Sequence, residues 1–388
     1  MMAHLRITAA EFEIAERAGV AGDVGALTVF LKKWEGNPDI ESCYFHSGFS
    51  LNNSPEENAR QIITRKHCFN SWEDYEAFNE TMKDPDSVVA KFERAADAVV
   101  NGDAATLKRM LADDPWLITA RSARSHHSTL LICVGANGFE GYRQKTPENA
   151  AEIAEILLGA GAEVDAMGDM YGGTTTLGLV ATSVHPVITG VQEELMEVLF
   201  RYGAGPDGVA PDYTDGSLIL ACLHNGRTEP IEYLAKHGAK VNLEAAGGIG
   251  DLDKMKSYFT PSGELTNGAT TQQRDAAFIW AAQCGKKDVV EFLLNLGVHA
   301  AVVLQGVTPL QSAVYGGQLE VVKFLLEHNA PLEIKNDYDG TVLGQALWCA
   351  YNNPKPDSLK IIDTLIAAGA KIEPGWEKYI DELNGCRE

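Results

Sequence analysis

The stretch TPLQSAVYGGQLEVVKFLLEHNAP, residues 308–331, carries the pattern on which the fold prediction depends. It opens with Thr308-Pro309, runs through small residues to Gly316-Gly317, and continues in a segment whose apolar residues recur at helical spacing. The spacing of Val321, Val322, Leu325 and Leu326 is typical of one buried face of a helix. The stretch therefore predicts two short helices joined by a glycine turn.

The same pattern recurs along the chain at a repeat-length interval. Shifting the stretch backwards places Ala281 and Gly285 under Ala313 and Gly317. Further copies include 341–343 continued at 359–370, the endings AEILLGAGAEVDA, MEVLFRYGAG and IEYLAKHGAKVN, and three weaker units that begin at Glu16, Ala96 and Glu244. We count about nine units. Helices this short are marginal alone, so the units are expected to stack on one another as a solenoid.

The pattern T-P-L-x-x-A-x-x-G-G-x-x-x-V-V-x-x-L-L-x-x-x-A, followed by NDYDGT at 336–341, resembles an ankyrin repeat. The resemblance implies an all-α solenoid of helix-turn-helix repeats with short β-hairpin-like fingers, whose concave face is lined by the first helices and the fingers. The histidine of T-P-L-H, which normally supports finger hydrogen bonds, is replaced here by Ile132, Gly178, Leu220, Ile279, Gln311 and Gly344.

Three regions are expected along the chain. Residues 1–91 form an N-terminal capping region with one degenerate repeat and a helical insertion, residues 92–372 form the repeat solenoid, and residues 373–388 form a C-terminal tail or cap. The insertion contains two capped, amphipathic segments, 54–65 and 71–82. Their apolar stripe, Trp72, Tyr75 and Phe78, is expected to pack over the first repeats, with a separate partner-binding lobe as the alternative.

Composition narrows the class of partner. The 388 residues carry 54 acidic and 32 basic side chains, which gives a formal net charge of −22. Because this charge opposes counterion-release binding, nucleic acids and membranes are disfavoured, and a neutral or basic protein or peptide is expected, with a small molecule as a further option. The first residues lack an apolar leader core and no stretch has ~18 consecutive apolar residues, so we expect a cytoplasmic protein.

Motifs for catalysis and for metals are absent from the sequence. The seven cysteines are scattered without a C-x-x-C pair, which disfavours disulfide and zinc frameworks. GGIGDL at 247–252 has only the glycines of a dinucleotide-binding loop. His126-His127 could supply metal ligands, but adjacent side chains point in different directions, so a solvated pair is expected. The sequence therefore predicts neither a cofactor nor a metal.

Two long segments interrupt neighbouring repeats, at 139–149 and 183–192, where helices normally meet through a short turn. Long loops of this kind are often functional. Because the two occur at the same place in adjacent repeats, they should lie side by side, and Glu140, Tyr142, Arg143 and His185 could converge. The alternative is that Tyr142 packs, Arg143 pairs with Glu140, and His185 only helps to turn the chain.

Aromatic residues recur in the fingers and along the predicted groove. Three fingers carry a tyrosine beside turn residues: Tyr171, Tyr213 and Tyr338. Tyrosine is enriched in binding hot spots, so these fingers suit a partner surface as well as stacking between fingers. The repeat register, as the resemblance implies it, directs these candidate binding residues into the concave face: Asn137, Thr182, Ser183, His224, Asn225, Trp280, Tyr315 and Trp348. Arg143, from the loop at 139–149, is added to the candidate set.

Two functions compete at this point. The first is a binding module that holds a protein or peptide in the groove through the aromatic anchors and the finger tyrosines. The second is an enzyme with a small-molecule pocket in the irregular repeats three to five, in which His185 or His224 performs acid-base chemistry beside Glu140 and Tyr142.

Overall fold

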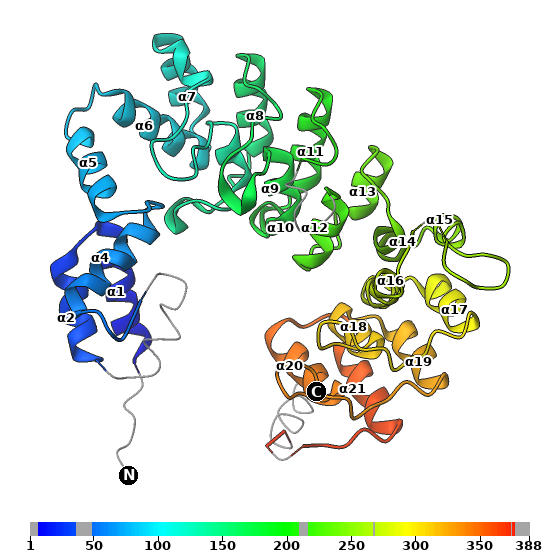
Figure 1. The fold of residues 1–388 in the computed structure, drawn as a ribbon. Coiled ribbons are helices and arrows are strands. Elements are labelled where there is room, and N and C mark those ends of the chain that lie inside the picture. The colour runs from blue at the N-terminus through cyan, green and yellow to red at the C-terminus, as the bar shows by residue number, and fades with distance from the viewer. Residues whose placement is uncertain (1–6, 36–48, 209–215, 267, 374, 377–388) are drawn as a thin grey trace. The chain divides into compact units, whose positions relative to one another are not determined.

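The computed structural model describes residues 7–35, 49–208, 216–266, 268–373 and 375–376. The chain divides into two compact units, unit 1 (residues 1–216) and unit 2 (residues 217–388), both built from short helices (Figure 1). Across the described residues there is no β-strand, and isolated antiparallel bridges such as Leu304 with Val307 mark the hairpin-like fingers. The predicted all-α repeat fold is confirmed, while the count of nine repeats stays a prediction.

Unit 2 contains two rows of helices, because each repeat supplies one helix to each row. The first row is α12 (Leu218–His224), α14 (Leu243–Ile249), α16 (Thr271–Gln283), α18 (Pro309–Gly316) and α20 (Val342–Asn352). The second row is α13 (Ile231–Lys236), α15 (Leu252–Lys256), α17 (Lys287–Asn295), α19 (Leu319–Glu327) and α21 (Ser358–Ala367).

The stretch 308–331 forms the two helices that it predicts, α18 and α19. Thr308 caps α18 by accepting a hydrogen bond from the backbone N–H of Gln311, whose side chain returns to the Thr308 backbone. The helix ends at Gly317, whose φ of 72° lies in the left-handed region that favours glycine. Behind this turn, the apolar stripe of α19 is buried in one continuous core that runs from Leu243 to Ala370.

Gln311 takes over the finger contacts that the resemblance assigns to histidine. Its side-chain Nε2 donates to the carbonyl oxygen of Ile334 at 3.1 Å and lies 3.5 Å from that of Gly340. The finger before α20 is therefore tied to α18 through an amide side chain.

Two glycines in α14 set how closely the first row packs. A Cβ added at Gly247 would lie 2.4 Å from the carbonyl oxygen of Ala277 in α16, and one added at Gly248 would lie 2.7 Å from the Leu223 side chain of α12. Contacts this short leave no room for a methyl group. Because α14 has no side chain at these two positions, α12 and α16 approach it closely, and the His224 and Trp280 rings meet with centroids 5.4 Å apart.

Replacing Gly247 by alanine is expected to destabilise unit 2. The new methyl group would meet backbone atoms of α16, which cannot rotate away as a side chain can, so we expect a loss of ~1–3 kcal/mol or more in the free energy of unfolding. Urea denaturation followed by circular dichroism measures the loss. Gly159→Ala at the end of α8 is the control, since its nearest neighbour would be 3.9 Å away. Equal stability of the two variants would contradict the close-packing explanation.

Unit 1 begins with helices that pack as a helical lobe before the repeats. Its α-helices are α1 (Ala9–Ala21), α2 (Val24–Lys33), α4 (Pro55–Lys66), α5 (Trp72–Met82), α6 (Val88–Val100), α7 (Ala104–Asp113), α8 (Ala150–Gly159), α9 (Thr176–Thr182), α10 (His185–Thr189) and α11 (Gln192–Arg201). Its 3₁₀ helices are η2 (Pro115–Ile118), η3 (Ile132–Gly135), η4 (Gly141–Arg143) and η5 (Met170–Gly172).

The two helices predicted in the insertion are present as α4 and α5. Ser54 and Ser71 cap them, and Glu57 completes a capping box at the start of α4. Tyr75 and Phe78 are buried and Trp72 packs against the same cluster, which joins α5 to α1, α2 and α4. The packing is that of a cap over the first helices, and the boundary expected at residue 91 stays a prediction.

Repeats three and four depart from regular helix pairs. The first helix of repeat three is replaced by the short η3, which ends at Ala136 in a left-handed conformation with φ 51°. Gly135 allows this turn to pack closely, since a Cβ there would lie 2.5 Å from that of Leu179 in α9. In repeat four the long segment contains the extra helix α10. The two loops touch where the Thr189 hydroxyl donates to the Thr146 carbonyl at 3.1 Å.

None of the helices within the described ranges is both long and apolar enough to cross a membrane. The cysteines described there, Cys68, Cys133, Cys222, Cys284 and Cys349, are free thiols.

Candidate functional site

A row of rings lies along the first-row helices in unit 2. His224, Tyr315 and Trp348 each stand seven residues after the N-cap of their helix, so the repeat register gives them equivalent positions in α12, α18 and α20. Tyr315 is 39% exposed and Trp348 is 50% exposed, although most residues of these helices are buried. Together with Trp280, these residues define what we call the aromatic strip.

Trp280 joins the aromatic strip from α16. Its ring lies against that of His224, and partial burial of the imidazole lowers the pKa of His224, which favours the neutral ring near pH 7. The buried indole Nε1 of Trp280 has no hydrogen-bond partner among the described residues. Trp280 is therefore a half-buried support for His224, whereas Tyr315 and Trp348 present more of their surface.

Tyr315 extends the aromatic strip back towards α12. A Cβ added at Gly226 would lie 3.6 Å from the Tyr315 hydroxyl, so the phenol reaches the turn that follows α12. Asn225, in the same turn, donates its side-chain amide to the Ala221 carbonyl at 2.8 Å. The predicted residues His224, Asn225, Trp280 and Tyr315 thus lie close together in unit 2.

Hydrogen bonds from side-chain amides connect the finger before α20 to the first-row helices α18 and α20. Asn336 Nδ2 donates to Gln345 Oε1 at 3.3 Å, and Gln345 Nε2 donates to the Gln311 carbonyl at 3.1 Å. Asn336 Oδ1 also accepts the backbone N–H groups of Tyr338 and Gly340, which shapes the turn. Tyr338 at the tip is 94% exposed.

The candidate binding residues of unit 1 do not form a continuous row of exposed rings. Tyr171 adopts a left-handed backbone with φ 54° and donates its hydroxyl to Asn137 Oδ1 at 2.9 Å, so these two predicted residues do meet. The Thr182 hydroxyl donates to the Gly178 carbonyl, and buried Ser183 accepts the His185 backbone N–H. Tyr213 lies outside the described residues.

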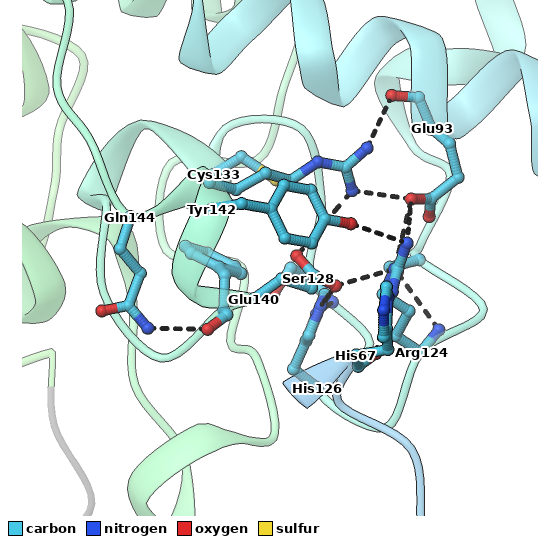
Figure 2. A network of polar contacts seen from close by, with 12 residues as sticks. His67, Glu93, Arg124, His126, Ser128, Cys133, Glu140, Tyr142 and Gln144 are labelled. Atoms are coloured by element: carbon cyan, nitrogen blue, oxygen red, sulfur yellow. Dashed lines mark hydrogen bonds and ion pairs between the residues drawn. The ribbon is translucent and has the colours of Figure 1, made fainter. Parts of the chain in front are cut away.

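A buried network of charged side chains is the second feature of unit 1 (Figure 2). Arg124 bonds Glu93 Oε2 through an Nη at 2.9 Å and lies 2.7 Å from Glu140 Oε1 through Nε. Arg143 bonds the same Glu93 oxygen at 2.6 Å and reaches the half-exposed carboxylate of Asp97 at 2.7 Å. The two arginines thus share Glu93, and both charges are neutralised by direct contact away from water.

His126 completes the network on the Glu140 side. The Ser128 backbone N–H donates to His126 Nδ1 at 3.2 Å, so Nε2 carries the proton of the neutral ring and donates to Glu140 Oε1 at 3.3 Å. Burial alone would raise the pKa of Glu140, but the His126 hydrogen bond and the charges of Arg124 and Arg143 outweigh it and hold that pKa below its usual range. Glu140 is therefore an ionised carboxylate in the folded chain.

Arg124 also ties the N-terminal lobe to the repeats. Its Nη1 donates to the His67 carbonyl at 2.8 Å, and its guanidinium lies 4.6 Å from the Phe78 ring centroid. A second Nη donates to the Tyr142 hydroxyl at 3.2 Å, and burial raises the pKa of Tyr142 to about 12. The network is therefore a joint between α4–α5 and the segment 122–143.

The convergence predicted for the two loops is met only in part. Glu140, Tyr142 and Arg143 share the network, but among the described contacts His185 does not take part in it. His185 begins α10, where its backbone N–H donates to the Ser183 hydroxyl and its carbonyl accepts a hydrogen bond from the Thr189 hydroxyl. The pairing of Arg143 with Glu140 is long, at 3.8 Å, because Glu93 and Asp97 hold the guanidinium more closely.

Sequence reasoning missed Glu93 and Arg124. It expected His126 to be one of a solvated pair, which is wrong, because His126 is buried against Glu140. Glu93 could have been noticed, because it stands four residues after Val89 and three before Ala96, within the apolar stripe of α6. A carboxylate at such a position needs a buried cation. Arg124 carries no comparable signal, and the burial of His126 could not be read from the sequence, since both residues lie in an irregular segment.

Removing the Glu140 charge is expected to destabilise unit 1. Glu140→Gln leaves Arg124 short of a partner, and breaking a buried pair costs ~3–5 kcal/mol in the free energy of unfolding. Because the folded pKa of Glu140 lies below its usual value of 4.5, its contribution is complete above pH 4.5 and is lost as the pH falls through the folded pKa. The difference from wild type should therefore shrink in acid.

Urea titrations of both proteins at several pH values measure this difference. Asp97→Asn is the control, because Asp97 contacts the same Arg143 but its side chain is 52% exposed, and we expect a change below ~1 kcal/mol. A pH-independent gap between wild type and Glu140→Gln would contradict the ionic explanation.

A depression in unit 2 has a volume of about 340 Å³ and is lined by residues 249–250 and 285–289, none of which belongs to the aromatic strip. Within the described residues no group of three or more His, Cys, Asp or Glu side chains could hold a metal ion.

Comparison with known proteins identifies one family. The model "Ankyrin repeats (3 copies)" matches residues 243–336 and 278–374. Among solved structures, the crystal structure of the human ASB11 ankyrin repeat domain is similar at 18% identity with a TM-score of 0.38, over 72% of this chain and 99% of that one. No curated protein matches the sequence.

Proposed function

Because residues 243–374 match a model of ankyrin repeats, and ankyrin repeats are general protein-interaction modules, we propose that this chain is a binding module that holds a protein or peptide along the aromatic strip of unit 2. The observation that carries the proposal is the exposure of Tyr315 and Trp348 on helices that are otherwise largely buried. The partner is neutral or basic, as the net charge of −22 favours, and the setting is the cytoplasm.

The proposal rests on the aromatic surface that the strip exposes to solvent. Large aromatic rings bury much apolar area and lose little conformational entropy when they bind, so a few of them can supply most of the binding energy. Tyr315 is held in place by the turn at Gly226, and His224 is held by Trp280. Such preorganised rings need little reordering on binding, which increases affinity.

No contact among the described residues favours the acid-base alternative. Glu140 and Arg143 are committed to buried ion pairs, and Tyr142 accepts a hydrogen bond from Arg124. Tyr171 and Tyr338 remain secondary binding candidates, each exposed at a finger.

The test is selection from a random-peptide library displayed on phage, with the full chain immobilised. Peptides that bind should lose affinity by about tenfold or more for the double variant Tyr315→Ala/Trp348→Ala, because two anchors are removed. Isothermal titration with the synthetic peptides measures the loss.

The matched control is Tyr202→Ala. Tyr202 is 42% exposed, close to the exposure of Tyr315, but belongs to unit 1, so this variant should bind as wild type does. Circular dichroism verifies that each variant is folded. Peptides that bind the double variant as tightly as wild type, or a library that yields no binder, would overturn the proposal.

A further inference from the structure

The finger tip before α20 and the nearby rings form one surface, which we call the acidic-aromatic corner: Tyr315, Asp337, Tyr338, Asp339 and Trp348. The Asn336–Gln345 bond fixes the finger on α20 one helical turn before Trp348. The bond from Gln345 to the Gln311 carbonyl then joins α20 to α18, which carries Tyr315. The acidic tip and the rings are therefore parts of the same face.

The carboxylates of this corner come from its finger. Helices α18 (PLQSAVYG) and α20 (VLGQALWCAYN) contain no charged residue. In the described part of the finger, the cation is Lys335, which lies 3.0 Å from Asp339 and 3.6 Å from Glu373, a residue outside the finger. Asp337 makes no ion pair among the described residues. The finger tip 335–339 therefore carries two aspartates and one lysine, so it has excess negative charge.

The rings of the corner stand free beside this charge. Tyr338 is almost fully exposed at the tip, between two aspartates, and Trp348 is half exposed. The negative face of an indole or phenol ring attracts a cation, most strongly when the cation is a planar guanidinium that can stack on it. The same guanidinium can bond a carboxylate through two N–H groups, which an ammonium group cannot do.

Resting on the proposed function, we infer that the acidic-aromatic corner receives an arginine side chain from an extended segment of the partner protein. The guanidinium stacks on an exposed ring, with Trp348 offering the largest face, and pairs with the carboxylate of Asp337 or Asp339. The neighbouring apolar part of the segment lies along Tyr315 towards His224. Charge complementarity selects this occupant, because an acidic segment would meet two aspartates at the finger tip, of which only Asp339 pairs with Lys335.

The test uses the peptides selected on the full chain in the phage experiment. Those that depend on Tyr315 and Trp348 should be enriched in arginine. Changing that arginine to glutamine should weaken binding by about tenfold, and changing it to lysine should weaken it less. Raising NaCl from about 0.05 M to about 0.5 M should weaken the arginine peptide more than the glutamine peptide.

A double-mutant cycle locates the contact. Asp337→Asn/Asp339→Asn should reduce affinity for the arginine peptide by about tenfold and remove its advantage over the glutamine peptide. Asparagine suits this turn, since it tolerates the left-handed φ of 61° at position 339. The control Asp253→Asn/Asp288→Asn makes the same change in net charge at exposed residues of α15 and α17 and should leave both affinities unchanged.

The outcomes separate the two proposals. Strip-dependent peptides that lack arginine, or that prefer lysine equally, would overturn the arginine assignment and leave the binding module standing. If Asp253→Asn/Asp288→Asn reduced affinity as much as Asp337→Asn/Asp339→Asn, the arginine assignment would likewise be overturned and the binding module would stand. A library that yields no strip-dependent peptide would overturn both.

Discussion

The close approach of helices at Gly247 and Gly248 is the constraint on which unit 2 depends. A helix normally keeps its neighbours apart by the width of its side chains, but α14 has only hydrogen atoms at these two contacts. Its neighbours α12 and α16 therefore meet across it, and the rings of His224 and Trp280 come into contact although they belong to repeats that are not adjacent in sequence. The contact between His224 and Trp280 in the aromatic strip follows from this absence of side chains.

Unit 1 is held together at its centre by a different kind of interaction. Glu93, Arg124 and Glu140 are all nearly inaccessible to water, and Arg124 contacts both carboxylates directly. Such a cluster adds little net stability over apolar packing, but removing one of its members leaves a buried charge without a partner. The lobe formed by α4 and α5 is thus joined to the repeats by geometry-specific bonds as well as by the Phe78 ring.

Much of the fold could be predicted from the sequence because its signals are local. The capping residues Ser54 and Ser71 predict the starts of α4 and α5, and the pattern at 308–331 predicts α18 and α19. The site was harder to predict. Glu93 and Arg143 lie 50 residues apart, and no periodicity links them. The sequence showed Gly247 only as part of the glycine-rich segment 247–252 and gave no role for it. Its close contact is with Ala277 of α16, and the sequence of α14 alone does not reveal which helix packs there.

The aromatic strip draws its members from α12, α16, α18 and α20, which belong to separate repeats. Repeat arrays can open one unit at a time from an end, because each unit is held only by its neighbours. A ligand that touches the whole strip must be released, at least in part, before the last unit can fray. Occupancy would thereby turn stepwise opening of unit 2 into a single concerted event, so that protease resistance near α21 would report on a ligand bound as far away as α12.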